Sequence, residues 1–198
     1  MQSHLALLLP VALVWWTAGY LADGLPRSTR ARGLRRQTGW LLALTGLGLT
    51  VALPIAGLAT VGATLADRAA AGLALAAVPA LVVAICTVRR VRRLRAGAGA
   101  LSVTPRTPAP HGLRAAAAHP LIGLPLQVTG LALLPALVTA SGAGQLLGPG
   151  ATGPAVTVGV LGVAAIGVRH ALRHNRLAER AMPERATSSA RPAGALHV

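Results

Sequence analysis

Long apolar stretches alternate with clusters of arginine along this chain, and this alternation constrains its fold more than any other feature. A helix needs about 20 mainly apolar residues to cross the hydrocarbon core of a bilayer. Five stretches approach or exceed that length, at about residues 5–21, 40–63, 69–88, 121–140 and 155–172. A soluble chain of 198 residues is too short to wrap five such segments in one core. The sequence therefore predicts an all-α polytopic membrane protein, a bundle of five transmembrane helices.

Composition agrees with a membrane protein. Hydrophobic residues make up 54% of the chain and charged residues 12%, against about 25% charged residues in a soluble domain. All nineteen basic residues are arginine, and only four side chains are acidic. Residues with GC-rich codons are abundant and lysine and phenylalanine are absent, which we interpret as coding bias in a high-GC bacterium.

The placement of arginine predicts the orientation. Five arginines lie between the first and second stretches, seven between the third and fourth, and six from the end of the fifth stretch onward, while the two other connections share only Arg68. Cytoplasmic loops carry the excess of positive charge. We therefore expect an external N-terminus and a cytoplasmic C-terminus in the cell (cytoplasmic) membrane. The first stretch lacks the preceding positive charge of a cleaved signal, so we expect it to be retained.

The predicted organisation is a five-helix membrane domain over residues 1–180, followed by a disordered cytoplasmic tail at 181–198. Residues 96–112 are rich in glycine and proline and predict a flexible cytoplasmic linker. The segment "VAICTVRRVRR" from Val83 resembles "VAAIGVRHALR" from Val163. This similarity suggests a weak two-hairpin repeat, as in some transporters; chance similarity between helices of like composition is the alternative.

Small residues and prolines within the stretches predict how the helices pack. Small residues recur at the four-residue spacing that lets helix backbones approach closely. They are Gly48, Ala52, Ala56 and Thr60 in the second stretch, Gly72, Ala76, Ala80 and Ala84 in the third, and Ala132, Ala136 and Ala140 in the fourth. A proline such as Pro125 leaves the carbonyl one turn earlier without its helical hydrogen bond. Inside a membrane, a neighbouring group must donate a hydrogen bond to that carbonyl.

Polar side chains at membrane depth usually mark function, and few are present. Gln127 is the most polar residue inside a predicted span, and Thr129, Thr45 and Thr50 are candidate partners in a substrate-binding site. Asp23 lies near the cytoplasmic end of the first span, where we expect an interfacial charge beside Arg27. Because no acid lies at mid-membrane, the sequence argues against a proton-coupled pump and against an intramembrane carboxylate enzyme.

Three histidines give a candidate metal or haem site. His119 begins the fourth span, and His170 and His174 end the fifth at the i and i+4 spacing of a two-histidine site. His119 and His170 could alternatively ligate a haem between adjacent helices. No acid or thiol completes a metal site and neighbouring arginines oppose one, so no cofactor is predicted and metal or haem remains an alternative.

Arginines at the cytoplasmic ends of the spans are expected to contact lipid phosphates. Val88, Val91 and Leu94 recur every three residues, which suggests a helix lying along the interface with arginines directed to an anionic leaflet. No stacking aromatic accompanies the charge, so we expect no nucleic-acid partner. The predicted lipid contacts are Arg89, Arg90, Arg92, Arg93, Arg169 and Arg173.

The functional hypothesis follows from what the sequence lacks. It contains no recognisable nucleophile motif and no acid pair, so an enzyme is disfavoured. We expect a small membrane protein that acts as an accessory or interacting subunit, through another membrane protein or by self-association. A transporter or permease component is the alternative, and a haem- or metal-binding membrane protein is the third hypothesis.

Overall fold

The computed structural model describes residues 2–58, 75–102, 104, 106–141 and 152–189. Within these ranges the chain is mostly helical and has no β-strand, which confirms the all-α prediction. The elements are α1 (Gln2–Gly24), η1 (Leu25–Arg27), α2 (Ala31–Leu58), η2 (Val83–Thr87), α4 (Val88–Ala100), α5 (His111–Ala117), α6 (Pro120–Ala132), α7 (Leu134–Ala140) and α8 (Thr152–Ser189). Residues 75–82 are also helical and lead into η2.

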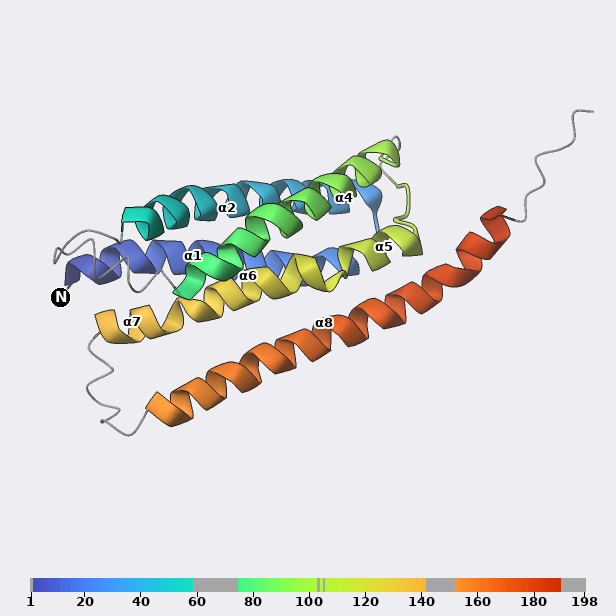
Figure 1. The fold of residues 1–198 in the computed structure, drawn as a ribbon. Helices are drawn as coiled ribbons and strands as arrows, with labels where there is room; N and C mark the ends of the chain where they lie inside the picture. The colour runs from blue at the N-terminus through green and yellow to red at the C-terminus, as the bar shows by residue number, and fades with distance from the viewer. Residues whose placement is uncertain (1, 59–74, 103, 105, 142–151, 190–198) are drawn as a thin grey trace, which may run out of the picture.

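The helices run back and forth along one axis (Figure 1). α2 returns beside α1, the helix over 75–100 runs back along α2, α5 to α7 return along α1, and α8 runs back alongside α5 and α6. The ends of α1 and α4 and the starts of α2 and α5 meet at one end of the bundle, here called the basic end because these segments carry Arg27, Arg32, Arg95 and Arg114.

Two helical stretches of the described chain are long and apolar enough to cross a membrane, Leu8–Arg27 and His111–Val138. A buried core helix of a soluble protein or a signal sequence has the same properties, so two such stretches are weak evidence for membrane association. The second and third predicted spans fall partly on residues 59–74, outside the described chain. A bundle of five spans is not confirmed by this result.

In the core, small residues on one helix leave room for large side chains of a neighbouring helix. Trp15 of α1 is 1% exposed, and a Cβ at Gly48 of α2 would lie 2.9 Å from its ring. Ala76 and Ala80 are buried in the same core. The predicted small residues are therefore buried at these positions, and Gly48 makes room for a large side chain of the neighbouring helix.

A proline in α6 explains a contact between two helices. Pro125 has no N–H to donate to the carbonyl of Leu121, four residues earlier. The hydroxyl of Thr87, at the end of the π-helix η2, donates to that carbonyl at 2.7 Å. The neighbouring helix thus satisfies the acceptor that the proline leaves free. A second proline, Pro135, lies where α6 gives way to α7, so the predicted 121–140 span is divided at Leu133.

Two predictions at the basic end were wrong in detail. Val91 and Leu94 are buried in the core, so α4 continues the preceding rod and packs on α2 instead of lying along an interface. Residues 96–100 of the predicted linker belong to α4, since Ala98 is fully buried there.

The predicted tail also differs at its start. α8 continues to Ser189. Leu177 packs with Ala115 and Ala118, and Ala181 is buried one turn later, so the start of the predicted tail belongs to the folded helix. Residues 190–198 lie outside the described chain.

Candidate polar site at the basic end

Asp23 is the centre of a charged cluster that joins α1 to α8. It lies near the end of α1 and is 8% exposed. Its Oδ2 accepts from Nη2 of Arg27 at 3.2 Å and from Nη2 of Arg169 at 2.6 Å, and its Oδ1 accepts from Nη1 of Arg173 at 3.0 Å. A buried carboxylate needs such partners to offset its lost hydration. One acid therefore holds three guanidinium groups.

Arg173 is the most enclosed of the three arginines. Its Nη1 also donates to the backbone carbonyl of Asp23 at 2.8 Å. Burial lowers the pKa of the Arg173 guanidinium, and the charge of Asp23 opposes that shift. The group stays protonated at any physiological pH, so Arg173 keeps its positive charge in its contact with Asp23.

The ring of His170 occupies space that is available because Gly123 has no side chain. It is 4% exposed, and a Cβ at Gly123 of α6 would lie 2.2 Å from its Cε1. Its Nε2 lies 3.1 Å from Oε1 of Gln127, an oxygen that only accepts, so His170 donates. Gln127 in turn lies against Gly19 of α1, where a Cβ would be 3.1 Å from its Cγ. Two glycines thus position the only amide that the sequence predicted as a site residue.

The other two histidines form a separate pair. The ring centroids of His119 and His174 are 5.1 Å apart. Nδ1 of His119 accepts from the backbone N–H of Leu121 and caps α6, while Nδ1 of His174 donates to the carbonyl of Ala115. His119 therefore lies beside His174. A haem bridged by His119 and His170 would need His119 to face His170 instead. Among the described residues, no group of three histidine, cysteine, aspartate or glutamate side chains could hold a metal ion.

A cavity of about 310 Å³ adjoins this cluster. Gln127 and Arg169 contribute its polar groups, and Trp15, Trp16 and Tyr20 contribute aromatic surface. The indole of Trp16 donates to the carbonyl of Gly130 at 3.0 Å, whereas Nε1 of Trp15 is buried without a hydrogen-bond partner among the described residues. The cavity is at the lower end of the size range of ligand pockets.

The three threonines predicted beside Gln127 do not join it. Thr129, Thr45 and Thr50 each donate to a carbonyl one turn earlier in their own helix. Arg89, Arg92 and Arg93 lie on the exposed side of α4 and Arg90 is half-buried there, while Arg169 and Arg173 bind Asp23.

Sequence reasoning found the ion pair of Asp23 with Arg27 but missed its contacts with α8, 146 and 150 residues away. Membrane depth was the available indication: the end of the first span and the end of the fifth both lie at the predicted cytoplasmic side. Because the chain has nineteen arginines, an arginine from any segment at the same membrane depth could form an ion pair with this acid. Spacing along the chain cannot choose among them.

No protein-family model, curated protein or solved structure matches this chain.

Proposed function

We propose that this chain is a small integral protein of a bacterial cytoplasmic membrane that has no catalytic role and acts through a partner protein or as an oligomer. In this proposal five helices span the membrane, with the N-terminus outside and the C-terminus in the cytoplasm. The back-and-forth course of the helices and the gathering of arginines at the basic end support this orientation.

The main observation that supports this proposal is the exposed, apolar first half of α8. Val158, Val160 and Leu161 are each more than 60% exposed, and Val168 is 59% exposed. The later part of the helix is held by Asp23, Gln127 and the α5 segment, but residues 157–165 expose every side chain except the half-buried Gly162. A helix attached at one end leaves the other available to another transmembrane helix.

Photocross-linking tests the partner. A photoreactive amino acid at Leu161 or Val168 should give a discrete protein adduct in native membranes, identified by mass spectrometry. Ile85 on η2 is 55% exposed and provides the control position. Adducts with another subunit define an accessory protein, and adducts with the same chain define an oligomer. Lipid adducts alone at all three positions would overturn the proposal.

Cysteine labelling tests the topology. After replacement of Cys86 by alanine, single cysteines at Ser141 and Ser102 are exposed in turn to a membrane-impermeant maleimide on intact spheroplasts. Position 141 should react and position 102 should not until the membrane is permeabilised. Equal labelling at both positions would contradict the five-span topology.

A transporter component is the second candidate, because the cavity beside Gln127 combines polar groups, aromatic walls and the unsatisfied indole N–H of Trp15. If this function is correct, liposomes containing the protein take up a substrate, and Gln127→Leu abolishes the uptake while Thr50→Val does not. Liposomes that stay sealed to the small organic acids and amides that suit this cavity would count against transport.

A further inference from the structure

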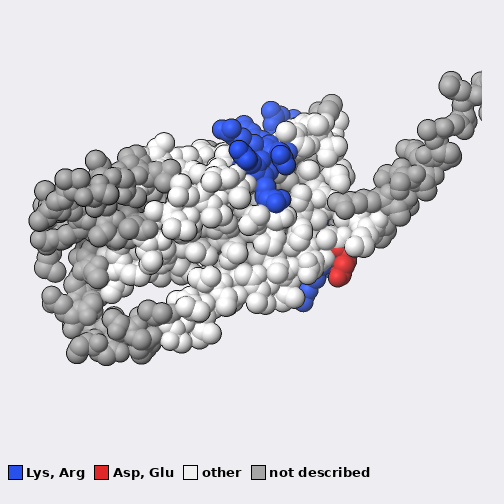
Figure 2. Space-filling model, viewed as in Figure 1, with Lys and Arg blue, Asp and Glu red and all other residues white. Residues whose placement is uncertain are grey.

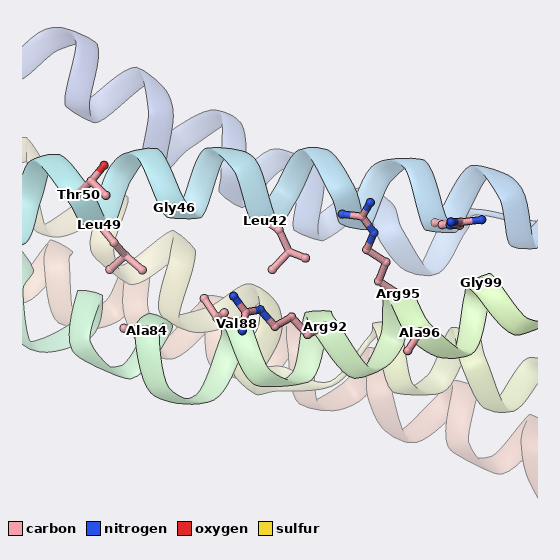
Figure 3. A pocket seen from close by; sticks show the side chains of 11 residues that line it. Leu42, Gly46, Leu49, Thr50, Ala84, Val88, Arg92, Arg95, Ala96 and Gly99 are labelled. Atoms are coloured by element: carbon pink, nitrogen blue, oxygen red, sulfur yellow. The ribbon is translucent and has the colours of Figure 1, made fainter.

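The groove between α2 and α4 lies on a different side of the bundle from the Asp23 cluster. Its volume is about 810 Å³, and it is lined by apolar residues at one end and by arginines at the other. Leu42, Leu49 and Val88 extend into the apolar part, and Arg92 and Arg95 follow along α4 (Figure 3). Arg35 of α2 completes the basic part.

Two arginines cross over the gap between the helices in opposite directions. The guanidinium of Arg95 on α4 lies against Gly39 of α2, where a Cβ would be 3.3 Å from Nη1. Arg35 of α2 lies against Gly99 of α4, where a Cβ would be 3.9 Å from Nε. Both side chains also line a second, adjoining pocket of about 420 Å³ with Arg32, Arg36 and Trp40. Glycine at each crossing point thus brings like charges together.

No acid balances this charge among the residues that line the two pockets. The described part of the chain gives Arg95 and Arg92 no ion pair, and Arg35 has only a 3.4 Å hydrogen bond to Ser102. Arginines gather over α2 and α4 as a blue patch with no red beside it in Figure 2. Like charges held near one another without an anion repel, so an anion bound in the groove would relieve this repulsion.

The dimensions of the groove fit an amphipathic anion. From Arg35 to Thr50 the groove follows 15 residues of α2, roughly 22 Å at 1.5 Å per residue. Its apolar part, Leu42 to Thr50, covers roughly 12 Å, close to half of the roughly 30 Å hydrocarbon core. Trp40 is 62% exposed at the level of the arginines, as in the aromatic belt of a membrane protein.

We propose that this groove binds one anionic glycerophospholipid, with its phosphate between Arg35 and Arg95 and one acyl chain along Leu42, Leu49 and Val88. Arginine is suited to phosphate because its planar donors can bind two oxygens at once. Basic pockets between helices on the cytoplasmic side are a recurrent way to hold anionic headgroups. The inference rests on the membrane location proposed above but is independent of any partner of α8.

Native mass spectrometry of the protein released from nanodiscs tests the site. The nanodiscs contain equal amounts of phosphatidylglycerol and phosphatidylcholine. The wild-type protein should retain one phosphatidylglycerol, and Arg35→Gln with Arg95→Gln should lower this retention about tenfold. The matched control, Arg89→Gln with Arg93→Gln, removes the same charge from α4 outside the groove and should retain the lipid. Equal losses in both double variants would overturn the proposal in favour of general surface charge.

A second variant tests the acyl chain. Gly46 lines the groove, and a Cβ at this position would meet no atom within 4 Å, so Gly46→Leu fills the space without displacing a neighbour. It should also lower retention, and glycerophosphoglycerol, the headgroup without chains, should not compete. Retention unaffected by Gly46→Leu, or competition by the free headgroup, would overturn a lipid site in favour of a simple anion site.

Membrane fractionation of the same variants separates this inference from the proposed function. All variants should remain in the membrane after carbonate extraction. Loss of wild-type protein from the membrane would contradict the proposed function, whereas membrane-bound protein with unselective lipid retention would contradict only the lipid site.

Discussion

α4 and α8 carry arginines in similar sequence patterns, but their surroundings differ. In α8, Arg169 and Arg173 bind one buried carboxylate and attach the helix to α1. In α4, the apolar side is packed in the core while Arg92 and Arg95 line an open groove that contains no acid. A single aspartate on a neighbouring helix therefore decides whether an arginine holds the fold together or remains available to an outside anion.

Removing the acid should make α8 resemble α4. Asp23→Asn keeps the shape but leaves three arginines without their carboxylate. We expect a loss of about 3 kcal/mol, near the lower limit for one partner of a buried ion pair, because Arg27 and Arg169 are largely exposed. The free energy of unfolding in mild detergent measures this loss, and a spin-label distance between α6 and α8 should broaden. Glu179→Gln on the exposed side of α8 is the control; an equal effect there would show that Asp23 is not the anchor.

The second attachment of α8 can be tested at Gly123. In Gly123→Ala the new methyl group would lie 2.2 Å from the His170 ring and force it away from Gln127. Overpacking of this kind costs about 2 kcal/mol. Gly33→Ala, where nothing lies within 4 Å, should instead gain up to about 1 kcal/mol from helix propensity. Thermal unfolding of the two variants should shift in opposite directions; a shift of the same sign would contradict the close contact.

One hydroxyl joins the 75–100 helix to α6. Thr87→Val removes the donor to the Leu121 carbonyl, which Pro125 leaves without a helical partner. An acceptor left unsatisfied in this way costs about 1.5 kcal/mol. Thr50→Val loses only a bond to its own exposed turn and should change the unfolding free energy by less than about 0.5 kcal/mol. Similar effects at both threonines would remove the special role of Thr87.

The smallest expected change supplies α4 with the acid that it lacks. In Gly39→Asp the new carboxylate would lie beside the guanidinium of Arg95. We expect about 0.5 kcal/mol of stabilisation, as for a surface ion pair, together with reduced phosphatidylglycerol retention. Gly39→Asn adds the same volume without charge and should not reduce retention. Unchanged lipid retention in Gly39→Asp would show that the lipid headgroup does not bind beside Arg95 in the groove.

Residue types and their order predict the helices of this protein. The apolar stretches, the arginine clusters and the small residues at four-residue spacing suffice for an all-α chain and for the burial of Gly48, Ala76 and Ala80. These features act within a helix or between neighbouring helix faces, where periodicity carries the information. The choice of Gln127 as the most polar residue inside a predicted span was likewise local, although its partner proved to be His170 and not a threonine.

Tertiary structure alone decided which distant groups meet. The threonines predicted as partners of Gln127 bond within their own helices, His119 pairs with His174, and Asp23 joins Arg173 across 150 residues. With nineteen arginines and four acids, the sequence alone is compatible with many different ion pairs. The choice depends on how each helix is rotated about its axis. That rotation is set by the packing of the whole bundle, as where Gly48 faces Trp15 and Gly123 faces His170, because packing is the interaction most sensitive to shape.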